Sequence, residues 1–133
     1  MRYKIFDQKG LNFITITVVD WVDLFTRKAI CDIVLSNLAF YRNKKGLKIF
    51  AYVIMSNHIH LIVRAAEEPE LSTIIRDFKS YLAREIIQFL NAQNRKESRK
   101  EWLLNHFQNA AKLDGKNRKH KIWKNGNRPI EIG

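Results

Sequence analysis

Three segments of the chain carry the apolar patterns that are typical of β-strands. Residues 11–19 (LNFITITVV) alternate between aliphatic side chains and aromatic or threonine side chains. Residues 47–55 (LKIFAYVIM) and 58–65 (HIHLIVRA) are two further runs, separated only by Ser56-Asn57. Two such runs around a two-residue turn predict an antiparallel hairpin.

Three other segments have apolar residues at helical spacing. Thr26 is the expected N-cap of the first helix, and Ser98 followed by Glu101 is a capping-box signature at the start of the third. The predicted helices cover residues 26–43, about 71–92 and about 99–112.

The order of these elements predicts the fold class. A short final strand over residues 120–124 completes the series strand, helix, strand, strand, helix, helix and strand. The order is that of a ferredoxin-like α+β sandwich, in which a central antiparallel sheet carries helices on one face. The opposite face of the sheet is then open to a ligand.

Length and composition agree with one folded domain, residues 1–133. Of the 133 residues, 46% are hydrophobic and 11% aromatic, which is enough for one core and too apolar for a disordered chain. The single cysteine, Cys31, excludes an internal disulfide and a cysteine-based zinc site, and is expected to be a buried thiol. The chain has no apolar run long enough to span a bilayer and no signal-peptide core at its start, which predicts a cytoplasmic protein.

The charge of the chain points to a polyanionic partner. There are 24 Lys and Arg against 13 Asp and Glu, a net charge of +11, which indicates nucleic acid or an anionic membrane surface. Residues 91–133 hold 11 of these cations against 4 acidic residues, with aromatic residues among them. Bases stack on rings while phosphates pair with cations, so this mixture favours single-stranded nucleic acid, although a solvated surface position is the simpler interpretation of any one residue. The candidate nucleic-acid-binding residues are Arg95, Lys96, Arg99, Lys100, Lys116, Arg118, Lys119, Lys121, Trp123 and Lys124.

The other aromatic side chains are expected to pack. Trp21 and Trp102 are interpreted as anchors of the core, and Tyr52 as a residue of the core or of a sheet face. For Trp123, which lies between two lysines, core packing and base stacking are both open.

Two histidines begin the third predicted strand and carry the most informative chemistry. His58 and His60 are two positions apart, so their side chains project from the same face of a strand. Two adjacent imidazoles supply half of a divalent-metal site, and a metal there could polarise a phosphodiester oxygen. The alternative is a pair of ordinary polar-face residues. Their place at a strand start, after a hairpin turn and on an open sheet face of a basic domain, favours the metal site.

The segment YVIMSNHIHLIVR, residues 52–64, resembles the HUH-motif strand of single-tyrosine transposases of the insertion-sequence and REP-associated group. In that group the segment typically reads Tyr-Val-Met-Pro-Asn-His-hydrophobic-His-Leu-Leu-Val. Residues 12–28 are similar to the first strand and following loop of the group, residues 74–81 to its second helix, and residues 95–107 to its third. The resemblance extends over residues 11–131.

This resemblance implies a metal-dependent endonuclease that acts on single-stranded DNA, often beside a hairpin. His58 and His60 would hold Mg²⁺ or Mn²⁺ against the scissile phosphate, and Asn57 would shape the turn. In the group a tyrosine attacks that phosphate, forming a 5′-phosphotyrosine link and freeing a 3′-hydroxyl, and the reverse reaction rejoins strands. Members are monomers or dimers that exchange helices, so a homodimer is one expectation.

The chain departs from the group at its C-terminal end. The catalytic tyrosine of the group lies on a late helix, in a stretch resembling Tyr-Ile-His-Asn-Asn-Pro-Val, after a segment like residues 128–131 (RPIE). The chain stops at Gly133, so we expect the tyrosine helix, and a polar metal ligand that it often supplies, to be missing and strand cleavage by this chain to be impaired. Tyr81 is the candidate for a relocated nucleophile, and the alternative is a packing tyrosine with its hydroxyl at the surface.

Two other functions stay open. A non-enzymatic nucleic-acid-binding module, or a domesticated regulator of hairpin DNA or RNA, would bind with steep salt dependence and without a metal. A basic peripheral membrane or RNA-binding protein is the third possibility, which the order of elements and the histidine pair disfavour.

Overall fold

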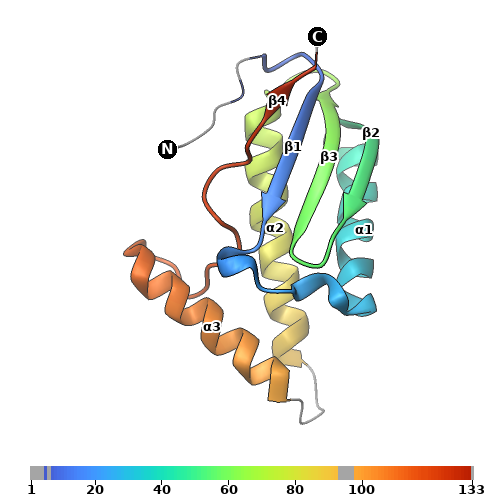
Figure 1. Cartoon of the computed structure of the whole chain (residues 1–133). Helices are drawn as coiled ribbons and strands as arrows, with labels where there is room; N and C mark the ends of the chain where they lie inside the picture. The colour runs from blue at the N-terminus through green and yellow to red at the C-terminus, as the bar shows by residue number, and fades with distance from the viewer. Residues whose placement is uncertain (1–4, 6, 93–97, 133) are drawn as a thin grey trace.

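A four-stranded antiparallel sheet forms the front layer of the molecule in Figure 1, and two long helices lie behind it. The computed structural model describes residues 5, 7–92 and 98–132. The spatial order of the strands is β2-β3-β1-β4, and each neighbouring pair is antiparallel. The strands are β1 (Asn12–Thr17), β2 (Leu47–Ile54), β3 (His58–Ala65) and β4 (Ile130–Glu131).

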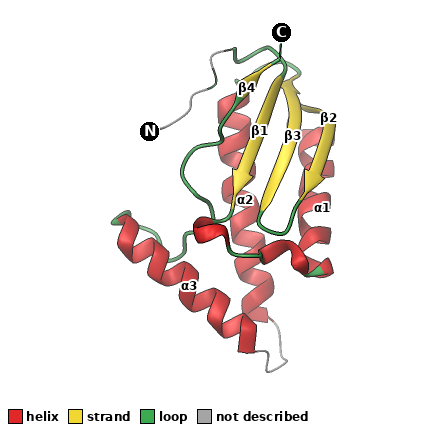
Figure 2. Ribbon diagram, viewed as in Figure 1, coloured by secondary structure: helices red, strands yellow, loops and turns green. Residues whose placement is uncertain are grey.

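The helices are segregated to one face of the sheet, as Figure 2 shows with α1 and α2 behind the strands. The helix α3 lies beyond the end of the sheet at which β1 ends and β3 begins. This arrangement confirms the predicted ferredoxin-like α+β class, with α3 added between α2 and β4. Among the described helices, none has the length and apolarity needed to cross a membrane. The helical elements are η1 (Val19–Trp21), η2 (Leu24–Thr26), α1 (Lys28–Lys44), α2 (Leu71–Ala92) and α3 (Ser98–Asp114).

Burial alternates along the central strands and separates a packed face from an open one. Ile14 and Ile16 of β1 and Ile59 and Leu61 of β3 are fully buried against the helices. Each such side chain contributes about 1.5–3 kcal/mol through its burial, so this face holds the sheet and the helices together. The apolar stripe of α2 packs on it through Leu71, Ile74, Ile75, Phe78, Leu82, Ile86 and Leu90.

Polar contacts join α1 to α2 at the edge of the core. The Tyr41 hydroxyl donates to Oδ2 of Asp77 at 2.6 Å, and Asn37 Nδ2 donates to Oε1 of Glu85 at 2.8 Å. Burial of the Tyr41 phenol, together with the Asp77 carboxylate, raises the pKa of Tyr41 well above its ordinary value of 10. Tyr41 therefore stays protonated and keeps donating at any ordinary pH.

Replacing Tyr41 with phenylalanine is expected to lower the free energy of unfolding by about 1–2 kcal/mol, because a hydrogen bond to a charged acceptor is lost while the ring stays in place. Urea denaturation measures the loss. Tyr81→Phe is the matched control, since the Tyr81 ring packs between the same two helices and its hydroxyl has no hydrogen-bond partner among the described residues. Equal losses in the two variants would contradict the assignment.

The predicted final strand over residues 120–124 is wrong. This segment crosses the end of β1, where Trp123 forms a single bridge with Val18 and Lys124 N donates to the Thr17 carbonyl at 2.8 Å. The chain then continues along the edge of the sheet, where Thr15 N donates to the Asn127 carbonyl at 2.8 Å, and it forms the strand that pairs with β1 at Ile130–Glu131. The last strand is therefore two residues long and lies further along the chain than predicted.

The predicted helix caps also differ from the structure. Thr26 ends η2, where its hydroxyl donates to the Asp23 carbonyl, and the N-cap of α1 is Arg27, which makes no side-chain capping bond. Ser98 begins α3, but its side chain lies outside what the structure describes, so the capping box with Glu101 stays a prediction.

The structure reverses the predicted burial of two tryptophans and settles or modifies that of three other residues. Trp21 and Trp102 are 62% and 52% exposed and do not anchor the core, whereas Trp123 is buried. Tyr52 is half-exposed at the outer strand β2. Cys31 is only partly buried, and its thiol donates to the Phe25 carbonyl at 3.0 Å. Hydrophobicity alone did not indicate which tryptophan the fold encloses.

Candidate functional site

His58 and His60 lie side by side on the open face of the sheet. They are the first and third residues of β3. Ile59, between them, is buried on the packed face of the sheet. Their ring centroids are 4.6 Å apart, with the ring planes at 73°. Thr17 and Thr15 of β1 are the direct cross-strand partners of His58 and His60. The predicted common face of the two imidazoles is thus present.

Each imidazole is held through its Nδ1 atom. His58 Nδ1 lies 2.7 Å from Oδ1 of Asn57, and His60 Nδ1 lies 3.0 Å from the Thr15 hydroxyl. Phe13 also stacks on the His60 ring, with centroids 5.1 Å apart. The Asn57 oxygen only accepts, so Nδ1 of His58 donates to it, which leaves the lone pair of a neutral ring on Nε2. This is the arrangement by which a hydrogen-bonded partner orients a metal-binding histidine.

The donor set fits a divalent cation that takes further ligands from outside the chain. Burial, and then the nearby His58, lower the pKa of His60 below its ordinary value of 6.5, so this ring is neutral at pH 7, which is the form that coordinates a metal. The described residues contain no group of three or more His, Cys, Asp and Glu side chains placed to hold an ion. Two imidazoles alone would leave most coordination positions for water or phosphate oxygens.

A cavity of about 560 Å³ opens in front of the histidines. Its walls come from β1, from the start of β3 and the turn before it, and from two segments that were not predicted to lie there, the η1 turn and the approach to β4. Arg128 adds a cation on the approach to β4, and Trp21 adds an exposed aromatic ring from η1. The lining residues are Thr15, Thr17, Trp21, Asn57, His58, His60, Arg128 and Ile130.

Replacing Thr15 with valine is expected to weaken Mn²⁺ binding about tenfold, because the hydroxyl that orients His60 is lost while the β-branched shape of the strand residue is kept. Titration of free Mn²⁺ by electron paramagnetic resonance, with a single-stranded oligonucleotide present, measures the affinity. Thr17→Val is the control, since Thr17 also lines the cavity but bonds to neither ring within the described chain. An unchanged affinity in Thr15→Val would contradict this role.

The structure divides the predicted nucleic-acid-binding residues into different environments. Asp114 holds Arg118 and Lys121, and Asp23 holds Arg99. These three cations are therefore already paired with carboxylates of the chain. Arg95 and Lys96 lie outside the described residues.

The other members of the predicted set differ in exposure. Lys116 and Lys119 are exposed on the segment after α3. Lys100 lies on α3 and has an interaction partner. Lys124 lies beside the histidine cavity, with its Nζ 4.7 Å from the centroid of the Trp21 ring.

Trp123 packs inside the protein. Its ring stacks on Phe25 with centroids 6.2 Å apart, and its Nε1 donates to the Lys79 carbonyl of α2 at 2.8 Å. The ring is therefore unavailable for base stacking, and the inclusion of Trp123 among the nucleic-acid-binding candidates is corrected. The same contact fastens the segment after α3 to the helix layer.

Tyr81 is not brought to the histidine pair. It lies on α2, where its ring stacks on Phe40 of α1 with centroids 6.1 Å apart and lies against Tyr41. The sheet separates this helix layer from the open face that carries His58 and His60. Of the other tyrosines, Tyr41 and Tyr52 do not line the cavity either, and Tyr3 lies outside the described residues.

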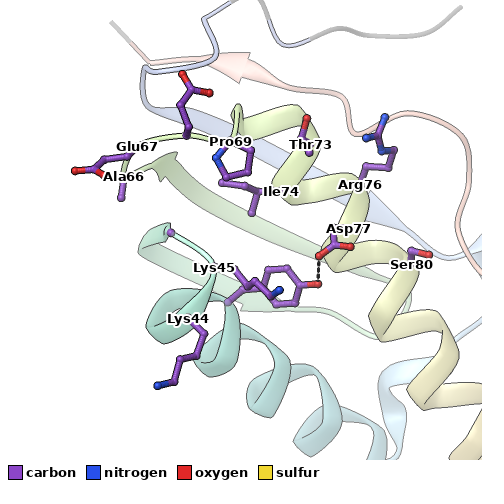
Figure 3. A pocket seen from close by; sticks show the side chains of 13 residues that line it. Lys44, Lys45, Ala66, Glu67, Pro69, Thr73, Ile74, Arg76, Asp77 and Ser80 are labelled. Carbon is purple, nitrogen blue, oxygen red and sulfur yellow. Dashed lines mark hydrogen bonds between the residues drawn. The ribbon is translucent and has the colours of Figure 1, made fainter.

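A second cavity, of about 660 Å³, lies in the helix layer, between the end of α1 and the start of α2 (Figure 3). Lysines from α1, acidic residues from the loop before α2 and the Tyr41–Asp77 pair surround it. Although this cavity is larger, it contains no histidine and its central polar contact joins two helices. The smaller cavity contains the histidine pair and is the candidate site.

Comparisons with known proteins agree with this fold. A search of curated proteins found no match. Among solved structures, the chain is similar to a REP-associated tyrosine transposase bound to a REP hairpin, with a TM-score of 0.54 and 14% sequence identity. The match covers 100% of this chain and 62% of that one, so the chain spans less than two thirds of the structure that it resembles.

A family model links the sequence itself to transposases. The model described as "Transposase IS200 like" matches residues 14–117, from β1 to the segment after α3. The match includes both histidines, Asn57 and the η1 turn. On this match over most of its length, the chain belongs to the IS200-like transposase family.

Proposed function

We propose that this chain is a DNA-binding transposase domain that binds an unpaired DNA strand, beside a hairpin, across the open face of its sheet. In this proposal His58 and His60 hold Mg²⁺ or Mn²⁺ against one phosphate of the strand. The observation that carries the proposal is the pair of imidazoles on the wall of an open cavity, each with Nδ1 engaged by the chain and Nε2 left for a ligand.

The charge around the cavity supports a phosphate ligand. Arg128 lines it, Lys124 lies beside it, and the chain as a whole carries a net charge of +11. A polyanion is attracted by such a field, and each phosphate that is neutralised on a single strand adds about −0.7 to the log–log salt slope. The structural neighbour is itself bound to a REP hairpin, which supports a hairpin as the partner here.

The residues of the chain do the positioning. A bound divalent cation would polarise a phosphodiester oxygen and offset the charge of a phosphoryl-transfer transition state. Asn57 and Thr15 fix the orientation of the two imidazoles, and Arg128 offers a cation to the strand that enters the cavity. The imidazole nitrogens suit Mn²⁺ better than Mg²⁺, which prefers a shell of oxygen ligands.

The placement of the tyrosines favours DNA binding without covalent chemistry by these 133 residues. None of the three described tyrosines, Tyr41, Tyr52 and Tyr81, lies at the cavity. We therefore expect no phosphotyrosine link to form on this chain alone. The same observation favours, as a second candidate, a nucleic-acid-binding module that has no enzymatic role.

Fluorescence anisotropy with labelled DNA tests the proposal. A hairpin with a single-stranded flank is expected to bind more tightly than a blunt hairpin of the same stem, more tightly still with Mn²⁺, and with a steep salt dependence. A denaturing gel of the same mixture is expected to show no protein–DNA adduct. The expectations of a cytoplasmic protein and of a homodimer stay predictions, and light scattering tests the second.

Three outcomes would overturn parts of this proposal. Equal affinity for the flanked and the blunt hairpin would contradict binding of an unpaired strand on the sheet. An adduct that survives denaturation and disappears in Tyr81→Phe would mean that Tyr81 reaches DNA after all. Binding that is independent of Mn²⁺ would leave the non-enzymatic module as the function.

A further inference from the structure

Trp21 presents a large aromatic ring to solvent beside the histidine pair. Its side chain is 62% exposed and lines the same cavity as His58, His60 and Arg128. A tryptophan is ordinarily kept out of water when the fold offers it a place in the core. This fold places Trp123 in its core and leaves Trp21 at the open face.

The backbone at this position is held in an unusual conformation. Asp20 and Trp21 have φ angles of 54° and 52°, in the left-handed region that residues other than glycine rarely adopt. Two contacts fix the turn: His106 Nε2 lies 2.9 Å from Oδ2 of Asp20, and Trp21 N donates to the Val18 carbonyl at 3.0 Å. Backbone strain of this kind collects at functional sites. Here its result is an exposed ring rather than better packing.

Asn57 connects the ring-bearing turn to the histidine site. Its Nδ2 donates to the Trp21 carbonyl at 3.3 Å, and its Oδ1 accepts from Nδ1 of His58 at 2.7 Å. One side-chain amide therefore sets both the position of the Trp21 backbone and the orientation of the His58 ring. The aromatic ring and the candidate metal ligand are held in register with each other.

A cation lies on the ring. Lys124 Nζ is 4.7 Å from the centroid of the Trp21 ring. An exposed aromatic ring with a lysine beside it matches the chemistry of one unpaired nucleotide, in which a flat base is joined to an anionic phosphate. A stacking contact of this type is tolerant of base identity, because every base has a π-face.

We propose that Trp21 is the stacking platform for an unpaired base next to the phosphate held at His58 and His60, with Lys124 pairing with the phosphate of the stacked nucleotide. This inference rests on the proposed function. It adds the residue that holds an unpaired base and so fixes which phosphate of the strand lies at the histidines. Trp21 is a positioning residue: it holds the nucleotide, while the histidines face the phosphate.

The test combines protein variants with a change in the DNA. Trp21→Ala is expected to bind the flanked hairpin about tenfold more weakly, and Trp21→Phe to recover most of the affinity. Phe50→Ala, which removes an exposed aromatic ring from the outer strand β2, is the control and is expected to change affinity less than twofold. In a second series, an abasic site is moved along the single-stranded flank. At one position the abasic site is expected to lower the affinity of the wild-type chain about tenfold and to leave the affinity of Trp21→Ala unchanged.

The outcomes separate this inference from the proposed function. If Trp21→Ala keeps wild-type affinity while Mn²⁺-dependent binding still requires the histidines, the stacking role is wrong and the proposed function stands. Additive losses from the abasic site and Trp21→Ala would also contradict stacking on this ring. If the wild-type chain binds no flanked hairpin, the proposed function is wrong and this inference with it. The abasic scan on the wild-type chain needs no variant protein, so it still tests stacking if Trp21→Ala folds poorly.

Discussion

Replacing both His58 and His60 with alanine is expected to abolish the gain in affinity for single-stranded DNA that Mn²⁺ brings to the wild-type chain. Both nitrogen ligands are lost together, so Mn²⁺ binding should weaken by more than the roughly 10–100-fold that follows when only a supporting partner is removed. Anisotropy titrations of the flanked hairpin, with Mn²⁺ and with a chelator, measure the effect. In the chelator, wild type and variant are expected to bind alike, because Lys and Arg contacts to phosphate remain.

A histidine away from the cavity provides the control. His120 Nε2 lies 3.5 Å from Nε2 of Gln108, and His120 does not line the cavity. The variant His120→Ala is expected to keep its response to Mn²⁺. An equal loss in His120→Ala, or a full Mn²⁺ response without His58 and His60, would contradict the metal site and favour the non-enzymatic module.

The stability of the chain is expected to rise by about 3 kcal/mol between pH 8 and pH 10.5 through Lys79 alone. Burial, and then the nearby Arg118, lower the pKa of Lys79 from 10.5 to about 8. Its ammonium donates to Oδ1 of Asn127 at 2.8 Å from within the protein. Above pH 8 the folded chain releases this proton while the unfolded chain keeps it, so the free energy of unfolding increases until about pH 10.5. One proton is worth about 1.4 kcal/mol per pH unit in this window.

Comparison with Lys79→Met isolates this contribution from the other groups that titrate in the same range. Methionine keeps the apolar stem and removes the proton, so the variant lacks the rise that belongs to Lys79. The wild-type free energy of unfolding minus that of the variant, from urea denaturation at several pH values, is expected to grow from pH 8 to pH 10.5. Lys116→Met, at an exposed lysine, is the control. The free energy of unfolding of the wild type minus that of this variant is expected to stay constant with pH. Parallel pH curves for wild type and Lys79→Met would contradict the assignment.

The parts of the fold that follow from local geometry could be predicted from the sequence. Alternation in β1 and β3 separates Thr15 and His60 from Ile14 and Ile59, because successive strand residues point to opposite faces. The common face of His58 and His60 follows from the same rule. The order of strands and helices then leaves few ways to cover the apolar face.

The parts set by contacts between distant segments could not be predicted in this way. Trp21 and Trp123 have the same side chain, but one is exposed by a turn that His106 of α3 holds, and the other is buried against α2. Arg128 reaches the histidine cavity only because the chain returns along β1 after α3. The final strand is only two residues long, which is too short for any periodic pattern to indicate.

Charge in the last third of the chain was also only partly informative. Asp114, the last residue of α3, pairs with Arg118 only four residues further along, in the segment after the helix, so this pairing is local in the sequence. The pairing of Arg99 with Asp23 joins α3 to the loop before η2 and has no local signal. A count of basic residues therefore overestimates the cations that remain for phosphate.

The most direct test of the account is the NMR spectrum of the four histidine side chains during titration with Mn²⁺. A bound Mn²⁺ ion broadens the signals of nearby nuclei, and His58 and His60 lie together while His106 and His120 lie on or beside α3. With the flanked hairpin present and Mn²⁺ well below the protein concentration, we predict selective broadening of the His58 and His60 imidazole signals. Broadening of all four histidines to the same extent, or of His106 and His120 alone, would contradict a metal site at this pair.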